Sequence, residues 1–285
     1  MSLTAVLRDS CTVRHLNTMI HKPDVLPSVP PLVERGQAHP GTMGTAFELL
    51  MLRGLMWRQD IRGRVRAPDR GVELLRSRNS PFSPKTSRLL GNMLAADSTM
   101  MFSPFVPTKD WDTKARRAWR LAIGTSFFRA SIWWEGGDEL AHQQIFSKLP
   151  EGVADELGAL HDLVPWEVFE PNKRFVVNPE FGDGTLKLWG ADADLVVDDM
   201  LIDIKTKSRC GVGIKDIRQL VCYALLANRF GLNGQKPYDS IKRVGVYMAR
   251  VGELRVFDLR ECIGRRDEKR VLQWLLGFYA NAMAA

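Results

Sequence analysis

The sequence predicts a mixed α/β fold of the α+β type, in which a central mixed β-sheet is flanked by helices and accompanied by a largely helical insertion. Residues 84–163 carry apolar side chains mostly at helical spacing, and the chain after Pro165 alternates between apolar and polar residues as β-strands do. Two amphipathic segments, 214–230 and 268–283, return to the helical period. A chain of 285 residues can bury a sizeable core as one large domain or as a core with an appended subdomain.

Residues 1–40 are expected to form a Pro-rich N-terminal lead-in. Five prolines fall between residues 21 and 40, which excludes a long helix there and favours an extended chain. Residues 41–285 are expected to form one domain. Within it we expect the helical insertion at about 60–163 and the part that carries the chemistry at about 164–285.

A helix is predicted directly after the lead-in. Thr42 or Thr45 is expected to cap it, and Phe47 and Leu50 are among the apolar residues that recur at helical spacing. Glu48 is an acidic residue within this apolar helix. It either lies exposed beside an arginine or directs its carboxylate into a site, and the helix by itself leaves both interpretations open.

Basic residues concentrate in two segments, an arginine-rich one at 57–90 and a second one at 114–120. Guanidinium groups suit phosphate oxygens because their donors form a planar fork. The segment at 57–90 is therefore a candidate to follow a nucleic-acid backbone, or else a solvated linker or a helix face with acidic partners nearby, and the segment at 114–120 forms a second basic cluster. The residues that we select as candidates for nucleic-acid contact are Arg62, Arg64, Arg66, Arg116, Arg117 and Lys207.

The helix predicted at 112–134 carries aromatic residues on an apolar stripe. Stacking on bases is one use for such residues. Aromatic side chains at helical spacing more often fill a core, and this is the interpretation we favour. The residues concerned are Trp119, Phe127, Phe128, Trp133 and Trp134.

Residues 188–207, LWGADADLVVDDMLIDIKTK, predict a β-hairpin around which the rest of the chain is organised. The first strand alternates along its length and directs Asp194 to one face. The two aspartates at 198–199 form the turn, since short acidic side chains tolerate the backbone angles that turns require. On the second strand Asp203 and Lys205 project from one face, so carboxylates and an ammonium group come together.

Charge on an apolar hairpin costs several kcal/mol unless it is paired or bound to a metal ion. Hydrolysis of a phosphodiester needs charge neutralisation at the phosphate and a deprotonated water, and a divalent metal ion supplies both. Mg²⁺ prefers one or two carboxylates, and a nearby cation can orient the water or stabilise the developing charge. Asp194, Asp203 and Lys205 provide these groups.

The elements after the hairpin are predicted from glycine positions and periodicity. Glycines at 211–213 end the strand, and the helix at 214–230 is expected to end at Gly231. Two strands then meet around residues 251–252, before the terminal helix. In the helix at 214–230, Gln219 and Tyr223 lie at i and i+4, so they share one face.

Four motifs together resemble those of the PD-(D/E)XK nuclease superfamily, in its branch of RecB-type and CRISPR-associated exonucleases. They are G-x-x-x-E at 44–48, A-D-L-V at 193–196, D-I-K-T-K at 203–207 and Q-x-x-x-Y at 219–223. D-x-K alone is a weak signal, but it is more specific between an acid-bearing strand and a Q-x-x-x-Y helix. The resemblance implies a restriction-endonuclease-like core and a nuclease domain that hydrolyses DNA with Mg²⁺ or Mn²⁺.

The resemblance also implies a role for each matching residue. Asp194 and Asp203 would be metal ligands, and the backbone carbonyl of Ile204 would be a further ligand. Lys205 would position or activate the attacking water, and Glu48 would complete the metal shell. The residues implied to face the substrate or to support the lysine are Gln219 and Tyr223.

The sequence departs from the family pattern in three places. Ala193 stands where the motif has proline. Asp192 shares a face with Asp194, so either is a candidate ligand, and Asp194 is preferred for its match to the motif. Cys262 alone cannot supply the closely spaced cysteine triplet of the iron–sulfur relatives, so no iron–sulfur cluster is expected.

Composition gives expectations about partners and compartment. The net charge of +7 and the pI near 9.4 indicate an anionic partner, with nucleic acid as the candidate. Four scattered cysteines indicate reduced thiols and a cytoplasmic location. No apolar run reaches the length of a membrane span, so no membrane partner is expected.

The leading hypothesis from the sequence is a metal-dependent deoxyribonuclease that works in a repair, restriction or anti-phage system. The sequence has no G-x-x-x-x-G-K-[ST] motif, so any helicase or ATPase activity is expected to come from a separate partner protein. Two alternatives stay open. One is a nuclease-fold nucleic-acid-binding or assembly module without catalysis, and the other is an RNA-directed nuclease.

Overall fold

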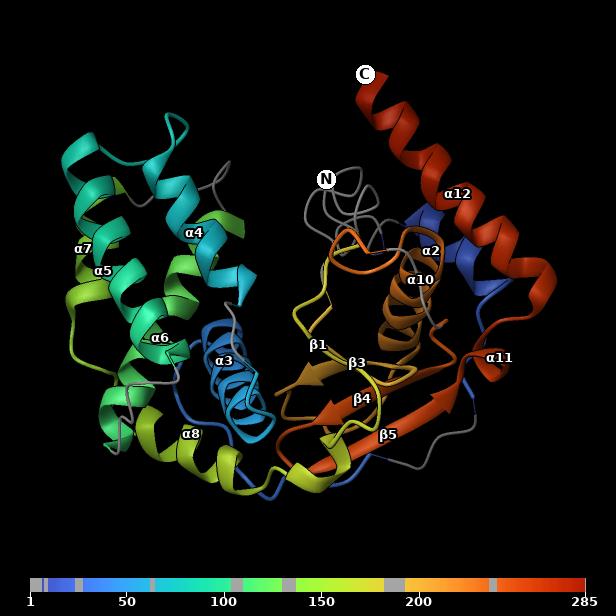
Figure 1. Ribbon diagram of the computed structural model, residues 1–285, viewed down its shortest axis with the longest axis horizontal. Helices are drawn as coiled ribbons and strands as arrows, with labels where there is room; N and C mark the ends of the chain where they lie inside the picture. The colour runs from blue at the N-terminus through green and yellow to red at the C-terminus, as the bar shows by residue number, and fades with distance from the viewer. Residues whose placement is uncertain are drawn as a thin grey trace. The chain divides into compact units, whose positions relative to one another are not determined.

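The computed structural model describes residues 7, 10–23, 28–61, 65–103, 110–129, 137–181, 193–235 and 240–284 (Figure 1). The chain divides into two compact units. The sheet unit comprises Met1–Pro30, Glu167–Lys205 and Arg209–Ala285, and the helical unit comprises Pro31–Trp166 and Thr206–Ser208. The helical unit therefore includes the helix that carries Glu48, whereas the predicted hairpin belongs to the sheet unit as far as Lys205.

In the described part of the sheet unit, five strands form one mixed sheet. They are β1 (Phe175–Val177), β2 (Leu195–Val197), β3 (Met200–Lys205), β4 (Arg243–Met248) and β5 (Glu253–Asp258), and they lie in this order. β3 and β4 are parallel and the other neighbours are antiparallel. Parallel neighbours need a long crossover, which helix α10 (Ile214–Phe230) provides. The prediction of a mixed sheet flanked by helices is confirmed.

Helix α10 packs on one face of this sheet (Figure 1). Its buried residues, such as Ile217 and Leu220, share one core cluster with Val196, Leu201 and Val244 of the strands. Each such side chain contributes roughly 1.5–3 kcal/mol when it is fully buried. As predicted, α10 ends before a glycine, at position 231, whose φ of 80° lies in the left-handed region that favours glycine.

Among the described residues, the sheet unit also contains the helices α2 (Ser10–Asn17), α11 (Leu259–Cys262) and α12 (Arg265–Ala284). Figure 1 shows α2 next to α12, and the rings of His15 and Trp274 lie 5.8 Å apart. Leu16 of α2 is fully buried. Part of the expected extended lead-in is therefore helical, because the prolines from which extended chain was inferred all follow residue 20 and leave 10–17 unaffected.

The helical unit is built around α3 (Pro40–Arg58), which is buried on nearly all sides. α3 packs against α6 (Trp111–Arg129) and α8 (Val153–Asp162). The described part of this unit also contains α4 (Arg66–Arg76), α5 (Pro84–Phe102) and α7 (Gly137–Phe146). The helices predicted over residues 84–163 are confirmed where the structure describes the chain, and the end of the helix predicted at 112–134 lies outside the described residues.

The start of α3 differs from the prediction that Thr42 or Thr45 caps it. Its N-cap is His39, whose Nδ1 accepts a hydrogen bond from the Thr42 N–H at 3.4 Å. Pro40 takes the first helical position, where the missing N–H of proline has no cost. The prediction was wrong because it overlooked this proline as a helix start.

α4 is a helix that the sequence argument missed inside the arginine-rich segment. It approaches α6 so closely that a Cβ on Gly71 would lie 2.6 Å from the Gly124 carbonyl oxygen, so glycine is needed there. On α6, Trp119 and Phe127 are buried, which confirms that they fill a core. The side chains of Phe128, Trp133 and Trp134 lie outside the described residues.

Candidate active site

The predicted hairpin is present as β2, β3 and the turn between them. Leu195 pairs with Ile202 in this antiparallel register, and Asp194 lies directly before β2. The Asp194 carboxylate reaches the N–H of Ile204, next to Asp203, and the negative charges of Asp203 and Asp194 both raise the pKa of Lys205. The fold therefore brings the two predicted carboxylates near the same lysine. The second candidate ligand, Asp192, lies outside the described residues.

The turn acids have structural partners of their own. The Asp198 carboxylate accepts hydrogen bonds from the backbone N–H groups of Asn172, Lys173 and Arg174 at 3.1, 2.7 and 3.1 Å. Partial burial alone would raise the pKa of Asp198, but these hydrogen bonds outweigh it and lower the pKa to about 2. Asp199 accepts a hydrogen bond from Arg243 Nε at 2.9 Å. Both acids thus hold the hairpin in place rather than facing Lys205.

The Asp194 carboxylate is held against the edge of β3. Its Oδ2 accepts a hydrogen bond from the Ile204 N–H at 2.6 Å. The N–H and C=O of one strand residue point to the same edge, so the Ile204 carbonyl also faces the Asp194 side. Two carboxylates and one backbone carbonyl therefore come from adjacent positions of the hairpin.

Lys205 is bound to Asp203 within the same strand. Its Nζ lies 2.9 Å from Asp203 Oδ1 and 2.7 Å from Oδ2. Asp203 is only 5% exposed, whereas the lysine side chain keeps 25% of its surface exposed. Burial lowers the pKa of Lys205, but the negative charges of Asp203 and Asp194 outweigh this and leave its pKa above the ordinary value.

Helix α10 contributes the remaining predicted residues of the sheet unit. Lys205 Nζ lies 3.5 Å from Gln219 Oε1, at the long end of hydrogen-bonding distances. Gln219 Nε2 in turn donates to the Tyr223 hydroxyl at 3.2 Å. The predicted shared face of Gln219 and Tyr223 is confirmed, and it points to the end of β3 that carries the charges.

Asp216 is a member of this cluster that sequence reasoning missed. Its Oδ2 accepts a hydrogen bond from the Gly213 N–H at 2.7 Å and so caps the start of α10. Its charge also raises the pKa of Lys205. The available signal was an acid three residues after a glycine, at the first turn of a predicted helix.

The donor set suits a hard divalent cation, because every candidate ligand is an oxygen atom. Among the described residues, no group of three or more His, Cys, Asp or Glu side chains is arranged to hold a metal ion. The carboxylates that the site offers to a metal ion are those of Asp194 and Asp203, whereas Asp216 caps α10. This matches the habit of Mg²⁺, which takes one or two protein carboxylates and completes its shell with waters and phosphate oxygens.

Glu48 lies in α3 of the helical unit, where it is half-buried. Gly44, the first residue of its motif, packs against Thr206, because a Cβ at Gly44 would lie 2.8 Å from Thr206 Oγ1. Gly44 and Glu48 are one helical turn apart on one face of α3. The participation of Glu48 in a metal shell stays a prediction.

The predicted nucleic-acid contacts have different surroundings. Arg62 and Arg64 lie outside the described residues, and Arg66 is the first residue of α4. Arg116 on α6 is exposed, whereas the next residue, Arg117, is half-buried with its Nε 3.7 Å from Asp97 Oδ1. Lys207, in the helical unit, is also exposed.

Comparisons with protein-family models, curated proteins and solved structures give no match to this chain. Among the described helices, none combines the length and the apolar character needed to cross a bilayer. The class that fold and site define is a mixed α/β protein whose sheet carries a cluster of two carboxylates and a lysine, beside helix α10.

Proposed function

We propose that this protein is a metal-dependent nuclease that hydrolyses phosphodiester bonds of DNA, on a restriction-endonuclease-like core. The observation that carries the proposal is the pairing of Asp203 with Lys205 on β3, with the carboxylate of Asp194 on the Ile204 N–H and Gln219 beside the ammonium group. A purely structural hairpin has no need for this set of charges on its covered face.

The proposed ligands for Mg²⁺ or Mn²⁺ are Asp194, Asp203 and the carbonyl oxygen of Ile204, with Glu48 added by the sequence motif. When bound, such an ion neutralises phosphate charge and makes a coordinated water more acidic. The oxygen-only donor set and the close approach of Asp194 to the Ile204 backbone support this assignment.

Lys205 acts on the phosphate through its charge. An ammonium group has three donors and no acceptor, so it donates to phosphate oxygens or to the attacking water. Its contacts with Asp203 and Gln219 restrict where the ammonium group can lie, which favours a prearranged donor. Gln219 and Tyr223 are therefore positioning residues that act through Lys205.

The test is a nuclease assay on the full chain with linear, circular and single-stranded DNA and with RNA. We expect DNA cleavage with Mg²⁺ or Mn²⁺ and none in EDTA. Asp203→Asn and Lys205→Met should each lower the rate by at least about 100-fold, since each removes charge stabilisation at the reacting phosphate. Asp199→Asn is the matched control, because it makes the same chemical change on the same hairpin at an acid that pairs with Arg243.

Circular dichroism would show that each variant is folded before its rate is compared. Equal cleavage rates for the parent and for Asp203→Asn would show that the site assignment is wrong. Binding of DNA without cleavage under any divalent metal would support the non-catalytic module instead. Cleavage of RNA but not DNA would support the RNA-directed alternative.

A further inference from the structure

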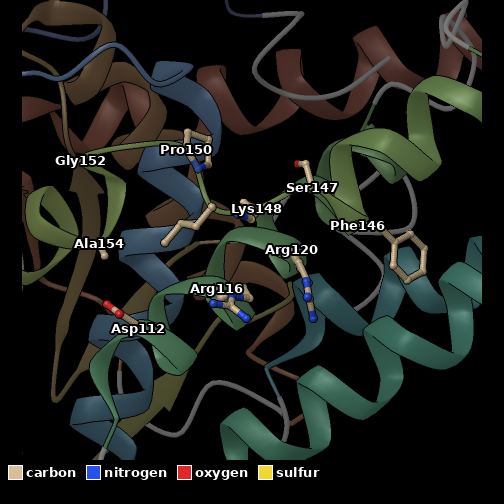
Figure 2. A pocket seen from close by; sticks show the side chains of 10 residues that line it. Asp112, Arg116, Arg120, Phe146, Ser147, Lys148, Pro150, Gly152 and Ala154 are labelled. Carbon is tan, nitrogen blue, oxygen red and sulfur yellow. The ribbon is translucent and has the colours of Figure 1, made fainter.

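The helical unit has a cavity of about 450 Å³ between α6 and the segment that joins α7 to α8. Figure 2 shows Arg116 and Arg120 on α6, with Ser147, Lys148 and Pro150 on the joining segment. The lining includes Asp112, Arg116, Arg120, Phe146, Lys148 and Gly152. None of the residues that line it was assigned to the proposed catalytic reaction.

The charges that line this cavity are mostly positive. The lining contains one carboxylate, that of Asp112, and three cationic side chains, which leaves an excess of two positive charges. The cations are Arg116, Arg120 and Lys148. Arg120 Nη1 lies 3.4 Å from Asp97 Oδ2, outside the lining. Asp97 also pairs with Arg117, so the negative charge of Asp97 is shared between two arginines. The cavity lining therefore carries an excess of positive charge.

The start of α8 lies at the same cavity, where the Val153 N–H already donates to the Pro150 carbonyl at 3.2 Å. Gly152 is the N-cap and provides no side-chain cap, and the cavity lining includes Gly152 and Ala154. The first N–H groups of a helix have no acceptor within the helix, and the helix dipole favours an anion there. Of the two acids in the first turn, Glu156 accepts a hydrogen bond from the Gly36 N–H at 3.1 Å, and Asp155 is exposed and does not line the cavity.

The cavity has more room than a phosphate group needs, and one of its walls is aromatic. Phe146 is 39% exposed, and its ring stacks on His142 with centroids 4.4 Å apart. Ligand cavities for whole small molecules typically measure about 300–1,000 Å³. An exposed aromatic ring beside cations matches a nucleotide, whose base can stack while its phosphate is bound.

We propose that this cavity binds the terminal phosphate of a nucleic-acid strand, with the last base near Phe146. A phosphomonoester carries a charge of about −1.5 to −2 near neutral pH, which matches the excess positive charge better than a singly charged phosphodiester does. The proposal extends the proposed nuclease function by a strand-end site. Its binding test needs no cleavage, so the two proposals fail separately.

The experiment measures binding of fluorescent single-stranded oligonucleotides to the full chain in EDTA, with and without a 5′- or 3′-terminal phosphate. We expect the parent protein to bind a phosphorylated end at least tenfold more tightly than the same strand without it. Arg116→Gln combined with Lys148→Gln should abolish this preference. Lys85→Gln combined with Arg88→Gln, an equal charge loss at exposed positions of α5, should retain it.

Competition identifies the part of the ligand that is recognised. A deoxynucleoside monophosphate should displace the phosphorylated strand, whereas the unphosphorylated nucleoside should not, and inorganic phosphate should compete more weakly than the monophosphate. Equal affinity for phosphorylated and unphosphorylated ends would overturn the proposal. A preference that survives the double substitution, or is lost equally in the α5 control, would also overturn it. Arg116→Gln alone serves if the double variant does not fold.

Discussion

Lys205 Nζ contacts both carboxylate oxygens of Asp203, at 2.9 and 2.7 Å, two residues apart on one face of β3. The carboxylate is buried and the ammonium group is partly exposed. The free-energy cost of removing two charges from water is about as large as the attraction between them. Such a pair is therefore weak evidence for stability. Removing one partner is different, because the other charge is then left in a site that cannot solvate it.

This asymmetry gives a prediction that needs no catalysis. Lys205→Met should lower the free energy of unfolding by about 1–3 kcal/mol, less than for a fully buried pair because the lysine is partly exposed. Adding Asp203→Asn should cost less than the sum of the two single changes, since the uncompensated charge is gone. Urea unfolding of the parent, both single variants and the double variant in EDTA measures this coupling. Additive effects would show that the two groups do not interact.

A second prediction concerns Gln219 as a positioning residue. Gln219→Ala should lower kcat by roughly 10–100-fold and leave KM nearly unchanged, because it frees the ammonium group that acts in the transition state. Tyr223→Phe removes only the hydroxyl contact to Gln219 and should have a smaller effect in the same direction. Steady-state kinetics of both variants on one DNA substrate measure the separate effects on kcat and KM. An increase in KM without a change in kcat would mean that Gln219 binds substrate instead.

A third prediction concerns the turn and acid stability. Asp198→Asn keeps a residue type that tolerates the φ of 55°. It removes the negative charge of the carboxylate that accepts three backbone hydrogen bonds. At pH 7 the free energy of unfolding should fall by about 1–2 kcal/mol. The folded-state pKa is lowered to about 2, so this contribution is present above about pH 4 and is lost as the pH falls toward 2.

The measurement is the unfolding free energy of the parent and of Asp198→Asn between pH 7 and pH 2. The difference between them should shrink over the lower half of that range. Asp258→Asn is the control, an exposed acid in the same unit that caps α11 without a side-chain hydrogen bond, and it should change little. A difference that stays constant down to pH 2 would mean that the charge of Asp198 is not what the turn uses.

Local pattern was sufficient to predict the hairpin, its turn and α10. Alternation fixed which face Asp203 and Lys205 share, and the spacing of Gln219 and Tyr223 fixed their common helical face, because both depend only on residues a few positions apart. The start of α3 and the presence of α2 and α4 were missed. Capping and short helices depend on competing local signals, such as Pro40 at a first helical position, that periodicity does not weigh.

The sequence by itself determined the acids, the lysine and the order of strand and helix, because side-chain chemistry and periodicity are local properties. Only the tertiary structure decided their partners: Ile204 N–H for Asp194, Asp216 near Lys205, and Asp97 rather than an external phosphate for Arg117. The cavity of Arg116 and Lys148 is likewise a tertiary result. Residues 32 positions apart meet there because α6 and the end of α7 pack together, and no sequence spacing encodes that contact.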